Sequence, residues 1–229
     1  MKKALIVRGG WEGHQPIETT NIFIPYLEEL GYEVCIEESP AIYADKDFMA
    51  TIDLIQQTNT MNIIERDQLQ GLQDAIVNGA GFAGWHGGIA DSYRNSSDYL
   101  QMVGGQFASH PGKNPAECIG EQSDNFLPHM INMTDLGKSH EITRGISDFE
   151  LTTEQYWVLH DSYNDVLATT TQKVRAWDPW NREITSPAIW TRNWGKGRIF
   201  VITCGHNVEV VLNPNVRTII ERGLVWASR

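Results

Sequence analysis

The sequence predicts an α/β fold, with a mostly parallel sheet that carries helices on both faces. Short apolar runs alternate with amphipathic helical segments in the N-terminal part of the chain, which is the pattern of βαβ units. Near the C-terminus, two apolar runs flank a Gly-containing turn and predict an antiparallel hairpin. No repeat, linker or low-complexity tract interrupts the 229 residues, so we expect one domain over residues 1–229.

Four strands are expected in the N-terminal part, where short apolar or alternating runs end at turn residues. They cover residues 3–8, 32–37, 52–56 and 80–85. The third is the weakest of these predictions, because the sequence around it (IDLIQQTNTMNII) is polar for a buried strand.

Two helices are expected between these strands. Residues 16–30 have apolar side chains at helical spacing and end at Gly31, a suitable C-cap. Pro25 lies inside this segment, so a kink or a late start is expected there. Residues 65–77 place their apolar side chains on one face and end at Asn78-Gly79.

Beyond residue 110 the pattern changes to short strands and loops. We expect strands within residues 116–121, 126–135 and 151–160. The predicted hairpin occupies residues 186–205. Residues 214–227 form a closing helix, whose inner face carries Val216, Ile219, Ile220 and Leu224.

Composition and charge restrict the expected partners. The net charge of −11 argues against nucleic acid and against an anionic membrane, both of which require a basic surface. Three cysteines indicate free thiols in a reducing compartment, and no apolar run suits a signal peptide or a transmembrane helix. We therefore expect a cytoplasmic protein that acts on a small molecule; association into homo-oligomers stays open.

Three of the seven histidines lie just past the carboxyl ends of expected strands. His14 follows the first strand, His86 the fourth and His206 the last. Ligands bind at this edge of open α/β sheets, so we expect the three side chains to meet there. One histidine in such a position is often only structural, but three at corresponding ends favour a functional site.

The stretch GFAGWHGG, residues 81–88, has the frame of a nucleophile elbow, with His86 where a Ser or Cys would stand. The glycines permit a turn that residues with a Cβ resist. Backbone N–H groups of Gly87 and Gly88 would then form an anion or oxyanion site for a substrate. The alternative is a tight packing turn in which the histidine is incidental.

Glu154 lies among aromatic residues in TTEQYW. Such surroundings raise the pKa of a carboxyl group and suit it to general acid–base work. The alternative is a solvated glutamate on an edge strand. His110 and His129 are expected to be structural residues of loops.

Aromatic residues are unusually frequent, with eight tryptophans in the chain. Burial in the core explains many such residues. A cleft lined with flat rings is the other explanation, since these rings stack on the apolar face of a sugar. The candidates for such a wall are Trp11, Trp85, Tyr156 and Trp157.

A metal site is a further alternative for the histidines. Imidazole groups suit Zn²⁺ and other divalent ions, so His14, His86 and His206 are candidate ligands. However, the sequence contains no HExxH or CxxC spacing. No cofactor is therefore certain from the sequence.

Four blocks of the sequence, taken in order, resemble the ThuA-like family, named after a trehalose-utilisation protein. They are GFAGWHGG, YLQMVGGQFASHPG, HEITRGISDFELTTEQYWV and PAIWTRNWGKGRIFVITCGHN. The resemblance runs from about residue 3 to residue 227. It implies a flavodoxin-like, doubly wound sheet similar to that of class I glutamine amidotransferases. It also implies a link to carbohydrate catabolism, notably of disaccharides and their keto derivatives.

The chain departs from the amidotransferase pattern at its reactive residues. His86 replaces the elbow Cys, and His206 is followed by Asn207-Val208, so the expected H-P-E pattern is missing. Glutaminase chemistry through a thioester is therefore excluded. The block at His140 also lacks the family's usual proline.

These residues lead to one main hypothesis and two alternatives. The main hypothesis is an isomerase, epimerase or hydrolase acting on a sugar or keto-sugar. His86 and Glu154 would transfer protons in it, and His14 and His206 would complete the site. The alternatives are a sugar-binding or regulatory protein without catalysis, and a metal-dependent hydrolase.

Overall fold

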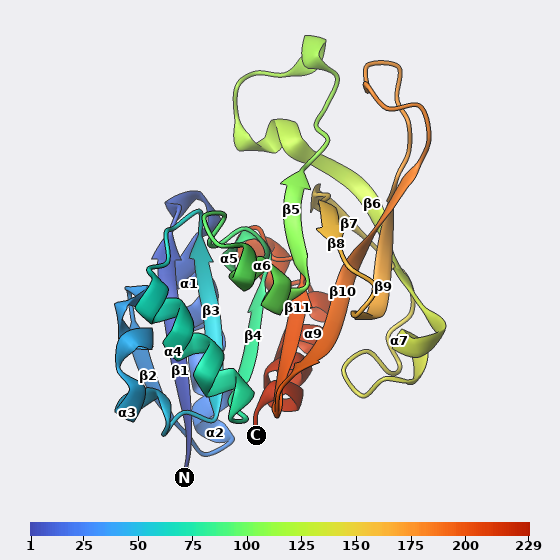
Figure 1. Cartoon of the computed structure of the whole chain (residues 1–229). Helices are drawn as coiled ribbons and strands as arrows, with labels where there is room; N and C mark the ends of the chain where they lie inside the picture. The colour runs from blue at the N-terminus through green and yellow to red at the C-terminus, as the bar shows by residue number, and fades with distance from the viewer.

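A nine-stranded mixed sheet forms the centre of the protein in a computed structural model that describes residues 1–229 (Figure 1). The strand order is β2-β1-β3-β4-β11-β10-β9-β6-β7, and β5 and β8 form a separate ribbon. The strands are β1 (Lys2–Gly10), β2 (Tyr32–Glu37), β3 (Leu54–Thr60), β4 (Gly81–Trp85), β5 (Gly105–Ser109), β6 (Phe126–Met133), β7 (Phe149–Glu154), β8 (Trp157–His160), β9 (Asp165–Gln172), β10 (Ile184–Trp194) and β11 (Gly197–Ile202).

The sheet has a parallel half and an antiparallel half. The strands β2, β1, β3, β4 and β11 run parallel, whereas β11, β10, β9, β6 and β7 pair antiparallel. This arrangement confirms the α/β class and the C-terminal hairpin, and it extends the antiparallel part well beyond that hairpin.

Helices cover both faces of the parallel half (Figure 1). One hydrophobic cluster joins the sheet to α2 and α9, and the other joins it to α4 and α6. Neighbouring strand residues such as Ala4 and Leu5 belong to opposite clusters, as the alternation of a β-strand requires. The helices are α1 (Pro16–Asn21), α2 (Ile24–Glu29), α3 (Lys46–Met49), α4 (Arg66–Val77), α5 (Gly87–Ala90), α6 (Ser97–Val103), α7 (Asp135–Ser139), α8 (Val208–Val211) and α9 (Pro214–Ala227).

Two segments show how tertiary contacts adjust the expected elements. The helix expected over residues 16–30 is divided into α1 and α2, and Pro25 stands in the first turn of α2. The polar third strand is longer than expected, and all of β3 is buried. Its Gln57 side chain is satisfied by the hydroxyl groups of Tyr43, Ser92 and Tyr99. These partners lie outside the strand, so its own sequence does not reveal them.

The strand expected over residues 116–121 is wrong. Pro115–Glu117 form a single 3₁₀ turn, and the chain then folds around the carboxylate of Asp124. That carboxylate accepts hydrogen bonds from the backbone N–H groups of Ile119, Gly120 and Glu121. These N–H groups are consequently not free to join a strand ladder.

Two long connections extend beyond the strand ends (Figure 1). One joins β5 to β6, and the other joins β9 to β10. Arg175 links them, because its Nη1 donates to the carbonyl oxygen of Gly112 at 2.6 Å. No helix in the fold has the length and apolar character required to cross a bilayer.

Candidate functional site

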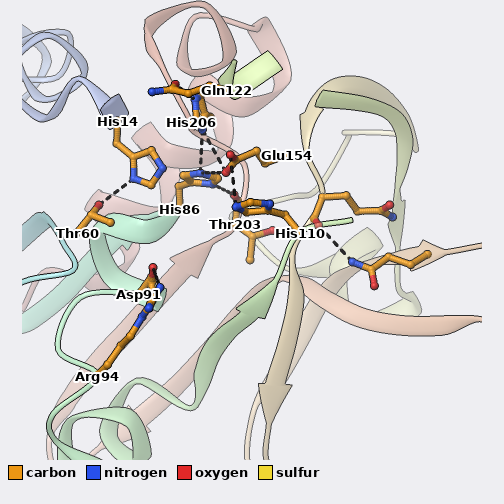
Figure 2. Close-up of polar contacts among 12 residues, drawn as sticks. His14, Thr60, His86, Asp91, Arg94, His110, Gln122, Glu154, Thr203 and His206 are labelled. Atoms are coloured by element: carbon orange, nitrogen blue, oxygen red, sulfur yellow. Dashed lines mark hydrogen bonds and ion pairs between the residues drawn. The ribbon is translucent and has the colours of Figure 1, made fainter. Parts of the chain in front are cut away.

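The fold brings four of the predicted residues together at one end of the sheet (Figure 2). His14 follows β1, His86 follows β4, His206 follows β11 and Glu154 ends β7. One nitrogen or oxygen atom from each lies within 4.8 Å of the others, and all four side chains are buried. We call these four residues the His–Glu cluster.

The turn at His86 has the backbone of an elbow. His86 has φ 52° and ψ −142°, a conformation that residues with a Cβ rarely adopt. The glycines around it allow close contacts. A Cβ on Gly88 would lie 2.7 Å from Thr58 Cα, and one on Gly87 would lie 2.7 Å from His14 Cε1. Gly87 therefore leaves the space that His14 occupies.

His86 is oriented from both sides. Its Nδ1 lies 2.7 Å from the carbonyl oxygen of Thr203, which can only accept, so Nδ1 carries the proton. The Nε2 lone pair of neutral His86 then faces the cluster, 3.1 Å from Glu154 Oε2. The ring also stacks on Tyr156, with 4.3 Å between the ring centroids.

The other two histidines are fixed in the same manner. The Nε2–H of His206 donates to Gln122 Oε1 at 3.0 Å, so its Nδ1 lone pair faces the cluster. His14 Nδ1 is hydrogen-bonded to the hydroxyl of Thr60 at 2.9 Å, which leaves Nε2 as its free nitrogen. Each ring thus has one nitrogen held by an outer partner (Figure 2).

Three acceptor atoms consequently converge. His86 Nε2 lies 3.3 Å from His206 Nδ1, and Glu154 Oε2 lies 3.1 and 3.2 Å from these two nitrogens. Lone pairs this close repel one another unless a positive charge lies among them. Two ligands at about 2.0–2.1 Å from a tetrahedral Zn²⁺ ion lie about 3.3–3.4 Å apart. Imidazoles oriented through their second nitrogen are also typical of metal sites. The His–Glu cluster can therefore hold a metal ion.

Burial and mutual contacts set the charges in the cluster. Burial lowers the pKa of His14 to about 2, and it also lowers the pKa of His86. Burial alone would raise the pKa of Glu154, but protons on the facing nitrogens of His206 and His86 stabilise its carboxylate, outweigh burial and hold this pKa well below its usual value. The expectation that aromatic neighbours raise the pKa of Glu154 is thus wrong. At neutral pH the cluster contains a carboxylate and a neutral His14, the protonation states that metal binding requires.

The predicted aromatic wall is only partly at the site. The ring of Trp11 lies 4.7 Å from that of His14 and is 37% exposed, so it stands at the rim. Trp85 is 1% exposed and packs on Phe23 in the core, so its expected contact with a sugar is wrong. Trp157 packs edge-on against Trp180.

Tyr156 and the two glycines after His86 also have defined positions. Tyr156 is buried beneath His86 rather than open to solvent. Its pKa is raised well above its usual value by burial. Gly87 and Gly88 are both buried, and the carbonyl oxygen of Gly88 accepts from Ser92.

The sequence did not reveal three residues that contact the cluster. His110 Nε2 lies 3.7 Å from Glu154 Oε1, and its side chain is 28% exposed. Thr60 and Gln122 are the outer partners already described. The position of Gln122 depends on the turn that Asp124 closes, which no local motif predicts. Thr60 ends β3, so a longer third strand would have placed it at the same edge.

A sequence comparison with protein families matches residues 3–227 to the family described as ThuA, trehalose utilisation. The chain belongs to the ThuA family. Among curated proteins, no sequence matches it. The ThuA assignment confirms the resemblance found in the sequence blocks and indicates a role in sugar metabolism.

Solved structures support the fold of this ThuA chain. A ThuA-like protein from Parabacteroides merdae superposes with a TM-score of 0.72 at 14% identity, covering 99% of this chain and 89% of that one. A cytoplasmic protein from Salmonella typhimurium LT2 gives 0.63 at 15% identity, with 100% of both chains covered. A β-galactosidase from Bacillus circulans gives 0.53 at 11% identity, covering 99% of this chain but 30% of that one. At such identities these likenesses concern the fold alone.

Proposed function

We propose that this chain is an enzyme of sugar metabolism whose His–Glu cluster binds a divalent metal ion and acts on a sugar or keto-sugar. The family supports the sugar, and the cluster supports the metal. The observation that carries the proposal is the convergence of His86 Nε2, His206 Nδ1 and Glu154 Oε2 at 3.1–3.3 Å. Two imidazoles and a carboxylate, with His14 beside them, are suitable ligands for Zn²⁺ and related ions.

The residues of the chain have separate tasks in this proposal. A divalent ion at the cluster supplies a Lewis acid that polarises a carbonyl group or activates water. Thr203, Gln122 and Thr60 hold the imidazole rings in the required orientation. His110 faces the cluster from a partly exposed position and offers an imidazole for moving a proton to or from the substrate. Trp11 at the rim offers a flat ring to the sugar.

A metal-free acid–base enzyme is the second candidate. The distance of 3.1 Å between His86 Nε2 and Glu154 Oε2 also suits a hydrogen bond from protonated His86 to the carboxylate. In that case a proton takes the place of the metal among the three acceptors. His86 and Glu154 would then transfer protons themselves. The two candidates therefore differ in whether a metal ion or a proton lies among the three acceptor atoms.

Metal analysis separates these candidates. The protein is purified without added metal, dialysed against Zn²⁺, Mn²⁺, Co²⁺ or Fe²⁺, and analysed for bound metal and for anomalous scattering from crystals. We expect about one ion per chain in the wild type and a loss of at least about 100-fold in affinity in His86→Ala and Glu154→Gln. His140→Ala removes a histidine outside the cluster and is the matched control.

Two results would contradict the metal proposal. One is a wild-type protein that binds none of the four ions. The other is an ion that remains at full occupancy in His86→Ala and Glu154→Gln. Sugar turnover by metal-free protein, lost in the same two variants, would support acid–base chemistry by these residues.

The cellular location is also part of the proposal. The similar Salmonella structure is described as a cytoplasmic protein, and this chain has three free cysteines, which suit a reducing compartment. We place the enzyme in the cytoplasm, with a small carbohydrate as its partner.

A further inference from the structure

The His–Glu cluster is covered by other parts of the protein. The exposed fraction of its four residues ranges from 1% for His86 and His206 to 6% for His14. A substrate that reacts at the cluster must contact these groups directly. Part of the surroundings must therefore move, as lids and loops do in many enzymes.

The side chain of Gln122 lies between the turns that carry His206 and His14. Its Oε1 accepts a hydrogen bond from His206 Nε2 at 3.0 Å (Figure 2). A Cβ on Gly13 would lie 2.6 Å from Gln122 Nε2, so the other end of the amide rests on the turn just before His14. Phe126, at the end of the same connection, places its ring edge-on to His206, with 4.9 Å between the ring centroids. The β5–β6 connection thus covers the cluster on this side.

Residues 113–124 of this connection form a loop whose two ends meet. The backbone N–H of Lys113 donates to the carbonyl oxygen of Asp124 at 2.7 Å, and Lys113 Nζ lies 4.0 Å from Asp124 Oδ1. Within the loop, the carboxylate of Asp124 binds the backbone N–H groups of residues 119–121. These bonds allow the loop to move as one body about the place where its ends meet, which we call the neck.

Little attaches the loop to the rest of the protein. None of the apolar side chains in residues 113–124 is buried, and Ile119 is 72% exposed. Only one hydrogen bond joins these residues to a part of the chain beyond β5, β6 and the connection itself, and it is the bond between Gln122 and His206. Segments with few buried apolar contacts open at a low cost in free energy.

The neck is anchored, in contrast to the loop beyond it. Gly112 directly precedes the loop, and its carbonyl oxygen accepts from Arg175 Nη1 at 2.6 Å. A pocket of about 410 Å³ between β6 and β9 lies beside this anchor, with Pro111 and Arg175 among its lining residues. The neck is therefore fixed at one point and has free space beside it, as a hinge requires.

We propose that residues 113–124 are a lid over the His–Glu cluster and that the hydrogen bond between Gln122 and His206 is its latch. The inference rests on the proposed function, because a reacting substrate is what requires access. Opening breaks the latch and uncovers the space between His206 and the turn at Gly13. Closing returns the acceptor to His206 and excludes water from the reaction. Closure of the lid and orientation of His206 are thus one event.

Carbethoxylation of the metal-free protein by diethyl pyrocarbonate tests the lid, with peptide mass spectrometry to measure the rate at each histidine. His86 is the reporter, because it is 1% exposed and forms no hydrogen bond with Gln122. Exposed His160 gives the rate without protection. Cys204, 3% exposed in the core, reports global unfolding through its reaction with a thiol reagent.

Three variants separate the latch from other effects. Gln122→Met breaks the latch while nearly keeping the side-chain volume. Gln122→Glu keeps an acceptor for His206 and should restore the latch. Gln101→Met makes the same change as the first variant on the exposed face of α6 and is the matched control.

We expect His86 to react at least about fivefold faster in Gln122→Met than in the wild type, as for the loss of one hydrogen bond. Gln122→Glu and Gln101→Met should resemble the wild type, and the rate at Cys204 should stay the same in all. Equal rates at His86 in the wild type and in Gln122→Met would overturn the lid. A parallel rise at His86 and Cys204 would also overturn it, since the whole domain would then be unfolding.

A distance measurement follows the loop itself. Cys118 is exposed within residues 113–124 and accepts a spin label. A second label at Gln101→Cys, with Cys35→Ser to remove the other accessible thiol, gives the distance from the loop to α6. We expect a broader distribution with longer distances in Gln122→Met, and identical distributions with and without the latch would contradict the lid.

Both measurements use protein without metal or sugar, so the lid and the proposed function can fail separately. A loop that stays closed in Gln122→Met would leave the metal proposal intact. A lid that opens as expected, in a protein that binds no metal, would overturn the proposed metal site alone.

Discussion

The two halves of the sheet differ in what they bring to the site. The parallel half supplies His14, His86 and His206, each from the end of a strand that its neighbours fix on both sides. The antiparallel half and its long connections supply Glu154, Gln122 and His110, together with the pocket between β6 and β9. The parallel half thus positions the three imidazole rings. The antiparallel half adds the carboxylate of Glu154, the amide of Gln122 that orients His206, and the neighbouring pocket.

The outer partners of the imidazoles give the most direct comparison of the two halves. Gln122 lies in the β5–β6 connection, and Gln122→Met removes the hydrogen-bond acceptor of His206. Thr60 ends β3, and Thr60→Val removes the hydroxyl group that is hydrogen-bonded to His14. We expect each change to weaken metal binding about 10- to 100-fold, because an orienting partner is lost. Competition with a chelator of known affinity measures both.

The metal affinities of the two variants show which half of the sheet orients the imidazole rings of the cluster. Comparable losses in both variants would mean that both halves orient it. A Gln122→Met variant with unchanged metal affinity would contradict the assigned role of the β5–β6 connection.

Stability against pH tests the charges on the two halves. The lowered pKa values of His14 and His86 mean that the unfolded chain takes up protons below pH 6.5 that the folded chain does not. Folding stability is therefore highest above this pH and decreases as the pH falls. His14, with its pKa lowered to about 2, accounts for about 2 kcal/mol between pH 7 and pH 5.

Urea unfolding of the metal-free protein at pH 7 and pH 5 measures this effect. His14→Ala should reduce the difference between the two pH values by a similar amount. Glu154 acts in the same direction but only at lower pH, because a carboxyl group takes up its proton there. An equal pH dependence in the wild type and in His14→Ala would show that His14 is not held neutral by burial.

The elbow backbone gives the smallest expected effect. His86→Ala and His86→Gly both remove the imidazole, but only glycine adopts φ 52° without strain. We expect His86→Gly to be more stable than His86→Ala by about 1–2 kcal/mol, although both lose the metal. Denaturant titration of the two variants measures the difference. Equal stabilities would show that the parallel half holds the corner without strain.

The sequence predicts the parallel half better than the antiparallel half for a physical reason. Parallel strands of one sheet share an edge, so strand ends at residues 10, 85 and 202 place their histidines together without any knowledge of side-chain contacts. In the antiparallel half, the position of Glu154 depends on the pairing of β6 with both β7 and β9. No local pattern specifies this pairing.

Trp85, Gln122 and His110 also show that local sequence patterns do not predict contacts between distant residues. Alternation along β4 places Trp85 on the same face as Ala83, and both belong to the core cluster that includes α9. The binding role expected for Trp85 rested on the high frequency of aromatic residues, which does not distinguish a buried ring from an exposed one. Gln122 and His110 lie in connections whose course is set by contacts such as that of Arg175 with Gly112. Such contacts join residues that are distant in the sequence.

The hydrogen bonds around Asp124 close the turn that carries Gln122 through contacts between residues near one another in the sequence. The carboxylate binds backbone groups of residues 119–121, and the backbone N–H of Lys113 donates to the carbonyl oxygen of Asp124 at 2.7 Å. Such a loop can be exchanged as one piece between related proteins without rebuilding the sheet beneath it. A chimera that exchanges only this piece would alter the surroundings of His206 while the histidines themselves stay in place.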